Sequence, residues 1–528
     1  MSTDLLPQGL APRLARRGVL GAGAATLGVA ALPGTAEAVT STEPDVTGRR
    51  SWSGTELPPT IQRRILTRFT YGFTQDDYQR MRDAPGWSAW FERQLTPASV
   101  PDPRLDEILA SLPDLYLPAA DQALQANTGR KPATHVQQQY FAATVARRVY
   151  STRQVEAMME DFWSNHFYVP GQLYLHPDYT RTLRQLAFGR FEDLLVAAEL
   201  HPAMLLSLST SDSTKEHPNE NQAREMLELH TVGRGGGGYT EDTVQQVARL
   251  MTGWHVDEYE LTYEPGRHWT GGLQALGWSH GNDSTDGRDA TLSFLKYLAH
   301  HPATADRICR KLAVRFVSDT PSDALVSSLA QVYLANDTQI RPVLRALIRH
   351  ADFVYGVDKK LRTPMEDCVG MIRAAGIGVR PVDPIDVNNS AFLNLAWMPA
   401  KAGQPLQGWS RPDGWPDVAT AWDGPSRAAA MLTWHWLAAS RDDPTFAGAT
   451  RPGGVELLPA TSLRFDQYVD HLCRFLLGFP ATDRLVRAAC AATGLSIATK
   501  VNGSSAATNE DWPRLLVSLF DSPDWLWK

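Results

Sequence analysis

Residues 218–233 read PNENQAREMLELHTVG, and this segment is marked at both ends as one helix. Pro218 suits a first helical turn, and Glu220 lies near the positive end of the helix dipole. Gly233 can adopt the left-handed conformation that ends a helix. At about 100° per residue, one side of this helix is made of Ala223, Met226, Leu227 and His230. The opposite side carries Asn221, Arg224, Glu225 and Glu228.

The polar side of this helix has two interpretations. It is a solvated surface if Arg224 and Glu228 form an ordinary pair four residues apart, which contributes only about 0.2–0.5 kcal/mol. It is a functional site if Glu225 and Glu228 share a buried face, because two such carboxylates can bind a metal or divide acid and base roles. A buried Arg224 between them would instead build a structural ion-pair network.

The same segment resembles the asparagine-glutamate-asparagine, alanine-arginine-glutamate and leucine-glutamate-leucine signature of the bacterial family called domain of unknown function 1800. Further motifs resemble that family at residues 161–167 (DFWSNHF), 201–206 (HPAMLL), 250–254 (LMTGW), 311–317 (KLAVRFV) and 412–417 (PDGWPD). The resemblance covers the chain from about residue 59 to its end. It implies no particular activity.

Composition and charge exclude some classes of protein. The 528 residues are 43% hydrophobic and 21% charged, as in a soluble globular protein, and the formal charge of −7 argues against a nucleic-acid binder. No stretch after the first forty residues is apolar for about 18 residues, so we expect no integral membrane segment in the mature chain. Four widely spaced cysteines exclude a zinc ribbon and leave disulfide pairing open.

The first 38 residues have the features of a twin-arginine signal peptide. Arg16 and Arg17 precede a mildly apolar run at residues 19–32, and residues 36–38 (AEA) offer a cleavage site. We therefore expect a secreted or cell-envelope protein exported in the folded state, which makes a bound divalent metal or another cofactor more plausible. Residues 39–58 are rich in Ser, Thr, Gly and Pro and predict a flexible linker.

The remaining chain, residues 59–528, predicts a mainly α fold, a large multi-helix globular domain. Alternating apolar residues and glycines predict a small β-hairpin within residues 256–284. Residues 377–425 predict a long aromatic loop. A division into two subdomains, residues 59–255 and 285–528, joined by the hairpin region, is left open.

A second candidate site centres on His166, next to Asn165 and near Asp161. His166 falls among apolar residues at helical spacing, so it is either a core histidine or a ligand. His230 and His268 are candidate partners in space. Together with the central helix, this pattern predicts Glu225, Glu228 and His166 as catalytic residues. The predicted metal ligands are His166, Glu225, Glu228 and His268.

A third candidate site is the aromatic loop, where Trp409, Trp415 and Trp422 accompany Asp413 and Asp417. Aromatic rings beside hydrogen-bond acceptors can hold sugars and other ringed ligands, so a glycan is a candidate ligand. The alternative is that these rings cap the helical body. The predicted ligand-binding residues are Asn221, Arg224, Asn165, Trp409, Trp415 and Asp417.

Three functions follow as hypotheses. The first is an exported, metal- or cofactor-dependent enzyme acting on an extracellular or cell-wall substrate. The second is a non-catalytic partner or scaffold, because family members resemble one half of a pair with the exported family called domain of unknown function 1501. This hypothesis is favoured by the apolar or small residues at positions where the family has polar groups: Ser164, Ser209, Thr210, Trp269 and Leu273. The third is a carbohydrate-binding module.

Overall fold

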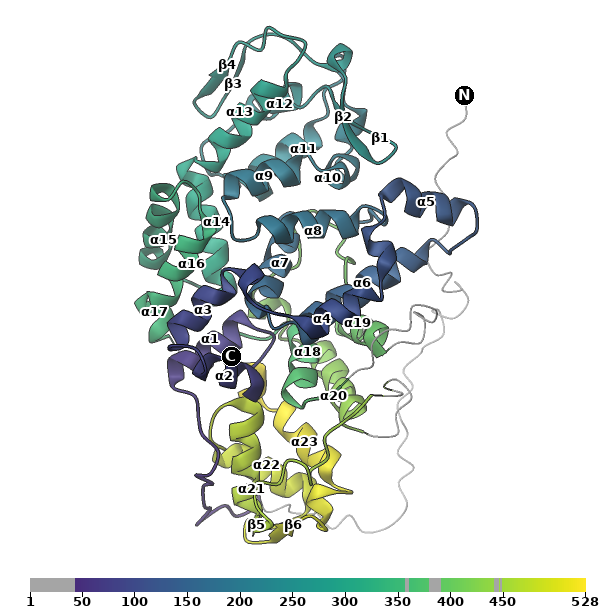
Figure 1. Ribbon diagram of the computed structural model, residues 1–528. Helices are drawn as coiled ribbons and strands as arrows, with labels where there is room; N and C mark the ends of the chain where they lie inside the picture. Colours follow the sequence, from purple (N-terminus) through teal and green to yellow (C-terminus); the bar gives the residue numbers. More distant parts are fainter. Residues whose placement is uncertain (1–42, 357–359, 379–390, 441–445, 447–448) are drawn as a thin grey trace, which may run out of the picture. The chain divides into compact units, whose positions relative to one another are not determined.

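The computed structural model of the protein describes residues 43–356, 360–378, 391–440, 446 and 449–528, and helices dominate them (Figure 1). The first half contains α1 (Thr60–Phe69), α2 (Gln75–Arg82), α3 (Trp87–Gln94), α4 (Pro103–Ala110), α5 (Ala119–Asn127), α6 (Thr134–Tyr150), α7 (Gln154–His166), α8 (His176–Leu186), α9 (Phe191–Glu199), α10 (Pro202–Ser207), α11 (Glu220–Glu225) and α12 (Glu241–Leu250). The predicted signal peptide, residues 1–38, lies outside the described residues.

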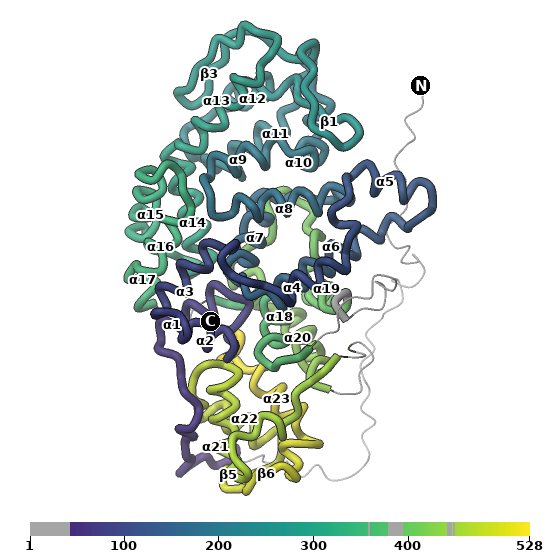
Figure 2. Tube along the Cα trace, in the orientation of Figure 1, coloured from purple at the N-terminus to yellow at the C-terminus, as the bar shows by residue number. Residues whose placement is uncertain are grey.

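The second half continues with α13 (Arg288–Ala299), α14 (Pro302–Phe316), α15 (Asp323–Ala335), α16 (Ile340–Arg349), α17 (Ala351–Val354), α18 (Pro364–Ala374), α19 (Ala391–Lys401), α20 (Pro425–Ala439), α21 (Phe465–Leu472), α22 (Asp483–Thr493), α23 (Trp512–Phe520) and α24 (Pro523–Leu526). Helices α14, α15 and α16 pack side by side (Figure 2). The predicted mainly α fold is confirmed. No described helix has the length and apolar character needed to cross a membrane.

The strands form three small antiparallel sheets in the described residues. β1 (Trp254–Asp257) pairs with β2 (Glu260–Tyr263), and β3 (Leu273–Ala275) pairs with β4 (Trp278–His280). The hairpin region thus contains two hairpins where one was predicted. β5 (Ser462–Arg464) and β6 (Lys500–Asn502) form a third sheet that was not predicted, since three-residue strands leave little pattern in a sequence.

The central segment is helical, as predicted, but it is not one regular α-helix. The side chain of Asn219 accepts a hydrogen bond from the Asn221 N–H and caps α11. At Met226–His230 the chain widens into a single π-helical turn, η4. Gly233 ends it at φ +85°, and its N–H donates to the carbonyl of Leu227 at 2.8 Å. The predicted apolar side is buried.

One hydrophobic cluster runs from Val46 to Trp525, and residues 44–528 form one compact unit. Phe69 of α1 stacks on Phe316 of α14, with ring centroids 4.2 Å apart. This contact joins the two segments that the sequence allowed to be separate subdomains. The four cysteines are buried and unpaired.

The part of the predicted linker that the structure describes is bonded to α21. The backbone N–H groups of Arg50 and Trp52 donate to the carboxylates of Asp466 and Asp470, at 2.8 and 2.7 Å. Both aspartates are almost completely buried. Residues 50–52 therefore satisfy two carboxylates that would otherwise be costly to bury.

The predicted loop at residues 377–425 contains a helix, α19, which corrects that prediction. Pro399 lies inside α19 and obscured its helical pattern. The remaining stretch, residues 402–424, connects α19 to α20 and contains one short 3-10 turn, Ala419–Ala421. We call residues 402–424 the aromatic loop.

A buried ionic group ties α20 to its neighbours. Nδ1 of His435 lies 2.6 Å from the carboxylate of Asp521, and Nε2 lies 3.2 Å from that of Asp367 on α18. Burial opposes the charged form, but the carboxylates of Asp367 and Asp521 outweigh it and raise the pKa of His435 to about 9. His435 is therefore a charged histidine in the core at neutral pH.

Candidate functional site

Four parts of the chain line a cavity of about 710 Å³. They are α7, the glycine-rich turn at residues 232–236, helix α14 and the aromatic loop. We call this space the α14 cavity. Three of the predicted ligand-binding residues line it, namely Asn165, Trp415 and Asp417.

Helix α14 supplies a row of basic side chains one turn apart. His301 caps its first turn by accepting a hydrogen bond from the Ala303 N–H, and Pro302 occupies the first position. Arg307, Lys311 and Arg315 follow at intervals of four residues, so they lie on the same side of the helix. The first two line the α14 cavity.

Arg315 and Lys311 differ sharply in their partners. Arg315 pairs with Asp161 at 3.0 Å, Glu366 at 3.2 Å and Asp417 at 3.4 Å. Lys311, which is half-buried, makes no hydrogen bond or ion pair to any residue that the structure describes. Burial, together with the neighbouring charge of Arg307, lowers the pKa of the Lys311 ammonium to about 7, although Asp417 and Asp413 oppose this shift.

Arg307 closes the end of the central helix. Its Nε and Nη2 both donate to the carbonyl oxygen of Leu229, at 3.1 and 3.0 Å. A guanidinium at this place complements the negative end of the helix dipole. Burial lowers the pKa of Arg307, which nevertheless stays charged at neutral pH.

Asn165 holds the aromatic loop in place. Its side-chain amide donates to the carbonyl of Trp415 at 2.8 Å and accepts from the Trp415 N–H at 2.6 Å. Gly414, at φ +72°, makes this docking possible, because a Cβ there would lie 2.1 Å from the carbonyl oxygen of Asn165. Asn165 thus acts on the cavity by positioning Trp415.

The three predicted tryptophans of the aromatic loop pack on one another. The rings of Trp409 and Trp415 lie 4.6 Å apart between centroids, and those of Trp415 and Trp422 lie 5.8 Å apart. Nε1 of Trp409 donates to Asp413 at 2.6 Å. Of these tryptophans, Trp415 lines the α14 cavity, whereas Trp409 does not.

The polar residues of the central helix point to two different places, and two of them point away from the α14 cavity. Arg224 pairs with Glu220 and with Glu241 of α12, and Asn221 is exposed, so neither joins the α14 cavity. Arg224 does not lie between the two predicted catalytic carboxylates as a buried network would require. It forms a partly exposed pair instead.

Glu228 and Glu225 lie nearer to the cavity. Oε2 of Glu228 accepts from Nε of Arg234, a residue of the cavity wall, at 2.7 Å. Burial raises the pKa of Glu225, and the charges of Glu228 and Asp413 add to this effect. Glu225 makes no hydrogen bond within the described part of the chain. Their roles in catalysis stay a prediction.

His166 is a core histidine. Its Nε2 donates to the carbonyl of His230 at 3.1 Å, and its ring lies among those of Phe162, Phe167 and Phe191. Burial, reinforced by the charge of Lys311, lowers its pKa well below the usual value, so the ring is neutral.

His268 lies in the hairpin region, away from the other predicted metal ligands. Its Nδ1 donates to the carbonyl of Thr252 at 2.7 Å, and Nε2 lies 3.0 Å from Oδ1 of Asn282. The four predicted metal ligands, His166, Glu225, Glu228 and His268, do not form a cluster of converging ligand atoms in the described residues.

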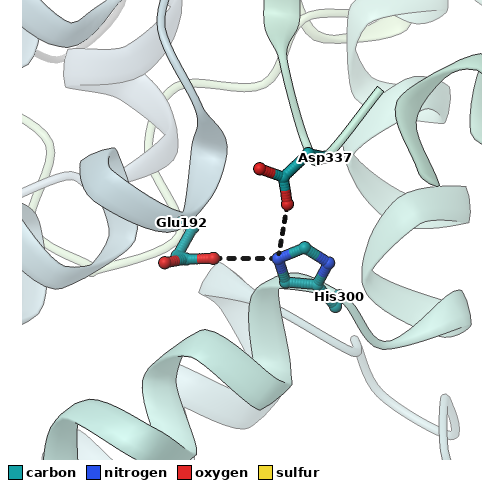
Figure 3. A group of neighbouring side chains, drawn as sticks. All are labelled: Glu192, His300 and Asp337. Atoms are coloured by element: carbon teal, nitrogen blue, oxygen red, sulfur yellow. Dashed lines mark hydrogen bonds and ion pairs between the residues drawn. The ribbon is translucent and has the colours of Figure 1, made fainter. Parts of the chain in front are cut away.

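Among the described residues, one group of three side chains does converge: Glu192, His300 and Asp337 (Figure 3). Nε2 of His300 lies 2.8 Å from Glu192 and 3.5 Å from Asp337. Arg190, however, pairs with both carboxylates, and Lys296 lies 3.8 Å from Glu192. The carboxylates thus already have cationic partners, and the group braces α9 against the turn before α16.

Two features of the site were missed from the sequence. Glu199 is fully buried and lies 2.6 Å from Nδ1 of the buried His230, and it also accepts from Nε2 of Gln222 at 3.0 Å. No local pattern links residues 199 and 230. Lys311 opens the KLAVRFV motif, and the basic residues 307, 311 and 315 recur at intervals of four residues, a pattern that is visible in the sequence.

Comparison with known proteins gives a family and no activity. No curated protein and no solved structure matches the chain. A family model described as protein of unknown function (DUF1800) matches residues 64–527, which include every wall of the α14 cavity. This match confirms the resemblance expected from the sequence motifs, and the chain belongs to the DUF1800 family.

Proposed function

We propose that this protein binds a small anionic ligand, one that carries a carboxylate, phosphate or sulfate group, in the α14 cavity. The observation that carries the proposal is Lys311, a half-buried lysine that faces the cavity with no partner in the described structure. A lysine in this state gains most from an added negative charge, because its desolvation is not offset by a carboxylate.

The charge of the cavity wall supports the same ligand class. The wall has three acidic side chains and five basic ones, the latter being Arg234, Arg307, Arg310, Lys311 and Arg411. Each of the acidic side chains is already bonded to a basic side chain or to a tryptophan. Arg234, Arg310 and Arg411 also have carboxylate partners, and Arg307 donates to a backbone carbonyl. Lys311 is therefore the cation of this wall that has no partner among the described residues.

The ring of Trp415 supports a ligand with a flat or ringed body beside its anionic group. Aromatic faces stack on sugar and heterocyclic rings, while cationic side chains hold the acidic substituent. An acidic sugar meets both requirements, so the carbohydrate hypothesis is kept here in a narrower form.

The test is a titration of the full-length mature protein with phosphate, sulfate, glucuronate and neutral glucose, followed by calorimetry. We expect the anions to bind and glucose to bind at least about tenfold more weakly, a difference of about 1.4 kcal/mol. Lys311→Met should weaken anion binding, whereas Lys500→Met, at an exposed position on β6, should not. Equal anion binding by wild type and Lys311→Met would overturn the proposal.

An enzyme, a scaffold and a bound metal remain proposals of lower rank. Elemental mass spectrometry of the exported protein beside Glu225→Ala/Glu228→Ala tests the metal: about one ion per chain, lost in the variant, would support it. Capture with a protein of the domain of unknown function 1501 family tests the scaffold.

Export by the twin-arginine pathway is also proposed. It is motivated by the adjacent Arg16 and Arg17 and the cleavage motif. Lys substitution of both arginines should retain the precursor inside the cell.

A further inference from the structure

We propose that Lys311 forms a covalent imine with the carbonyl carbon of a small anionic aldehyde or ketone held in the α14 cavity. This inference rests on the proposed anion binding and narrows the ligand to carbonyl acids such as 2-oxo acids. It assigns Lys311 the role of a nucleophile, beyond that of a cation.

The surroundings of the Lys311 amine are those of a reactive lysine. A lysine becomes nucleophilic at neutral pH when it is desolvated and lies next to another cation. Phe162 and Val314 supply apolar wall to the same cavity, and Arg307 lies one helical turn before Lys311. Burial and this arginine lower the pKa of Lys311 to about 7, which leaves about half of the amine unprotonated at neutral pH.

Lys360 and Lys528 are fully buried, and both differ from the half-buried Lys311 in their partners. Nζ of Lys360 lies 2.7 Å from a carboxylate oxygen of Asp319, and Nζ of Lys528 lies 2.7 Å from one of Glu366. Both amines are therefore occupied by a carboxylate. Lys311 opens onto a cavity and has no such partner among the residues that the structure describes.

Arg307 is placed to receive the anionic group of the ligand. Its Nε and Nη2 are fixed by the carbonyl of Leu229, while its Nη1 has no hydrogen-bond partner in the described residues. Gly233 lies against Nη1, and a Cβ at this position would come within 3.0 Å of it. Because residue 233 is a glycine, no side chain fills the space next to Nη1 of Arg307.

The chemical step balances with one proton from the solvent. The lone pair of the unprotonated Nζ attacks the carbonyl carbon, and one proton passes from the nitrogen to the carbonyl oxygen to give a neutral carbinolamine. The hydroxyl group then takes up a proton from the solvent, and the carbon–oxygen bond breaks as the carbon–nitrogen double bond forms, so that the oxygen leaves as water. The protonated imine carries one positive charge, which the nearby carboxylates of Asp413 and Asp417 stabilise.

The experiment is reductive trapping of the mature protein with pyruvate and cyanoborohydride, followed by peptide mapping in a mass spectrometer. Acetone is the neutral control, and lactate, which has no carbonyl carbon to attack, is the competitor. An exposed lysine has on the order of 0.05% of its amine unprotonated at pH 7, so we expect labelling of Lys311 to exceed that of Lys500 at least about tenfold. Lactate should suppress it, and acetone should label both lysines weakly.

Lys311→Arg separates covalent chemistry from binding, because it keeps the positive charge and removes the nucleophile. This variant should still bind lactate and phosphate but give no adduct at position 311. The charged or titratable groups around Nζ are Arg307, His166, Asp413 and Asp417. Labelling of Lys311 should rise through about pH 7.

Three results would overturn the imine: no preference for Lys311 over Lys500, equal labelling by acetone, or no effect of lactate. If phosphate and lactate still bind in such a case, the imine fails and the anion-binding function stands. If no anion binds to the wild type, both fail.

Discussion

Replacement of Gly414 by alanine tests whether the aromatic loop is held by its contact with α7. The glycine has φ +72°, and a Cβ there would lie 2.1 Å from the carbonyl oxygen and 2.7 Å from Oδ1 of Asn165. The loop must move to relieve this overlap. Movement breaks the two hydrogen bonds between Asn165 and the backbone of Trp415.

The expected cost can be worked from these contacts. Each of the two hydrogen bonds contributes about 1 kcal/mol, and an alanine with positive φ costs about 1 kcal/mol more than a glycine. The sum for Gly414→Ala is about 3 kcal/mol. Gly403→Ala is the matched control, because Gly403 has φ +91° in the same loop but a Cβ there meets nothing within 4 Å. It should cost about 1 kcal/mol.

Hydrogen exchange of the Trp415 amide and denaturation followed by tryptophan fluorescence measure the two effects. Gly414→Ala should expose the amide, alter the fluorescence of the tryptophan cluster and weaken anion binding, while Gly403→Ala keeps all three close to wild type. Equal destabilisation by the two substitutions would refute the reasoning, because the overlap with Asn165 is what distinguishes them.

Three further predictions concern the rest of the protein. Since the pKa of His435 is raised from 6.5 to about 9, its charge stabilises the fold fully below 6.5, and this stabilisation is lost as the pH rises through about 9. His435→Gln should therefore cost about 3 kcal/mol near pH 6, with a difference from wild type that shrinks above pH 9 in urea unfolding. Glu199→Ala should cost about 3 kcal/mol, because it leaves the buried Nδ1 of His230 without an acceptor, and Glu199→Gln, which keeps one, should cost less. Arg234→Met should change the unfolding midpoint little, since the Arg234 side chain is 81% exposed and water screens its pair with Glu228.

The sequence predicted what depends on local pattern. The position and buried face of the central helix followed from its caps and periodicity, and the motif around Gly414 marked the aromatic loop. The predicted loop and Asn165 do meet at one cavity. The polar residues of the central helix do not all face one site, because Arg224 pairs with Glu241 of α12. The periodicity of the helix could not identify this partner.

The missed features depend on contacts between distant residues. Glu199 and His230 are 31 residues apart, and their pairing arises only when α9 packs beneath the central helix. The basic residue Lys311 is visible in the sequence, but its lack of a partner is not. Lys311 lacks a partner because Arg315 pairs with the nearby carboxylates, and these contacts exist only in the fold. His166 had two readings, and its aromatic surroundings decide for the core.

The π-turn at Met226–His230 fixes the number of residues in the central segment, in addition to their types. Before the turn, Arg224 pairs with Glu241, and at the last residue of the turn, His230 pairs with Glu199. Loss of one residue would restore regular α-helical pitch and rotate one end relative to the other by about 100°. One of the two pairs would then break. Insertions and deletions among relatives should therefore avoid residues 224–230. They should be tolerated at Gly238, which does not line the α14 cavity and has open space around it.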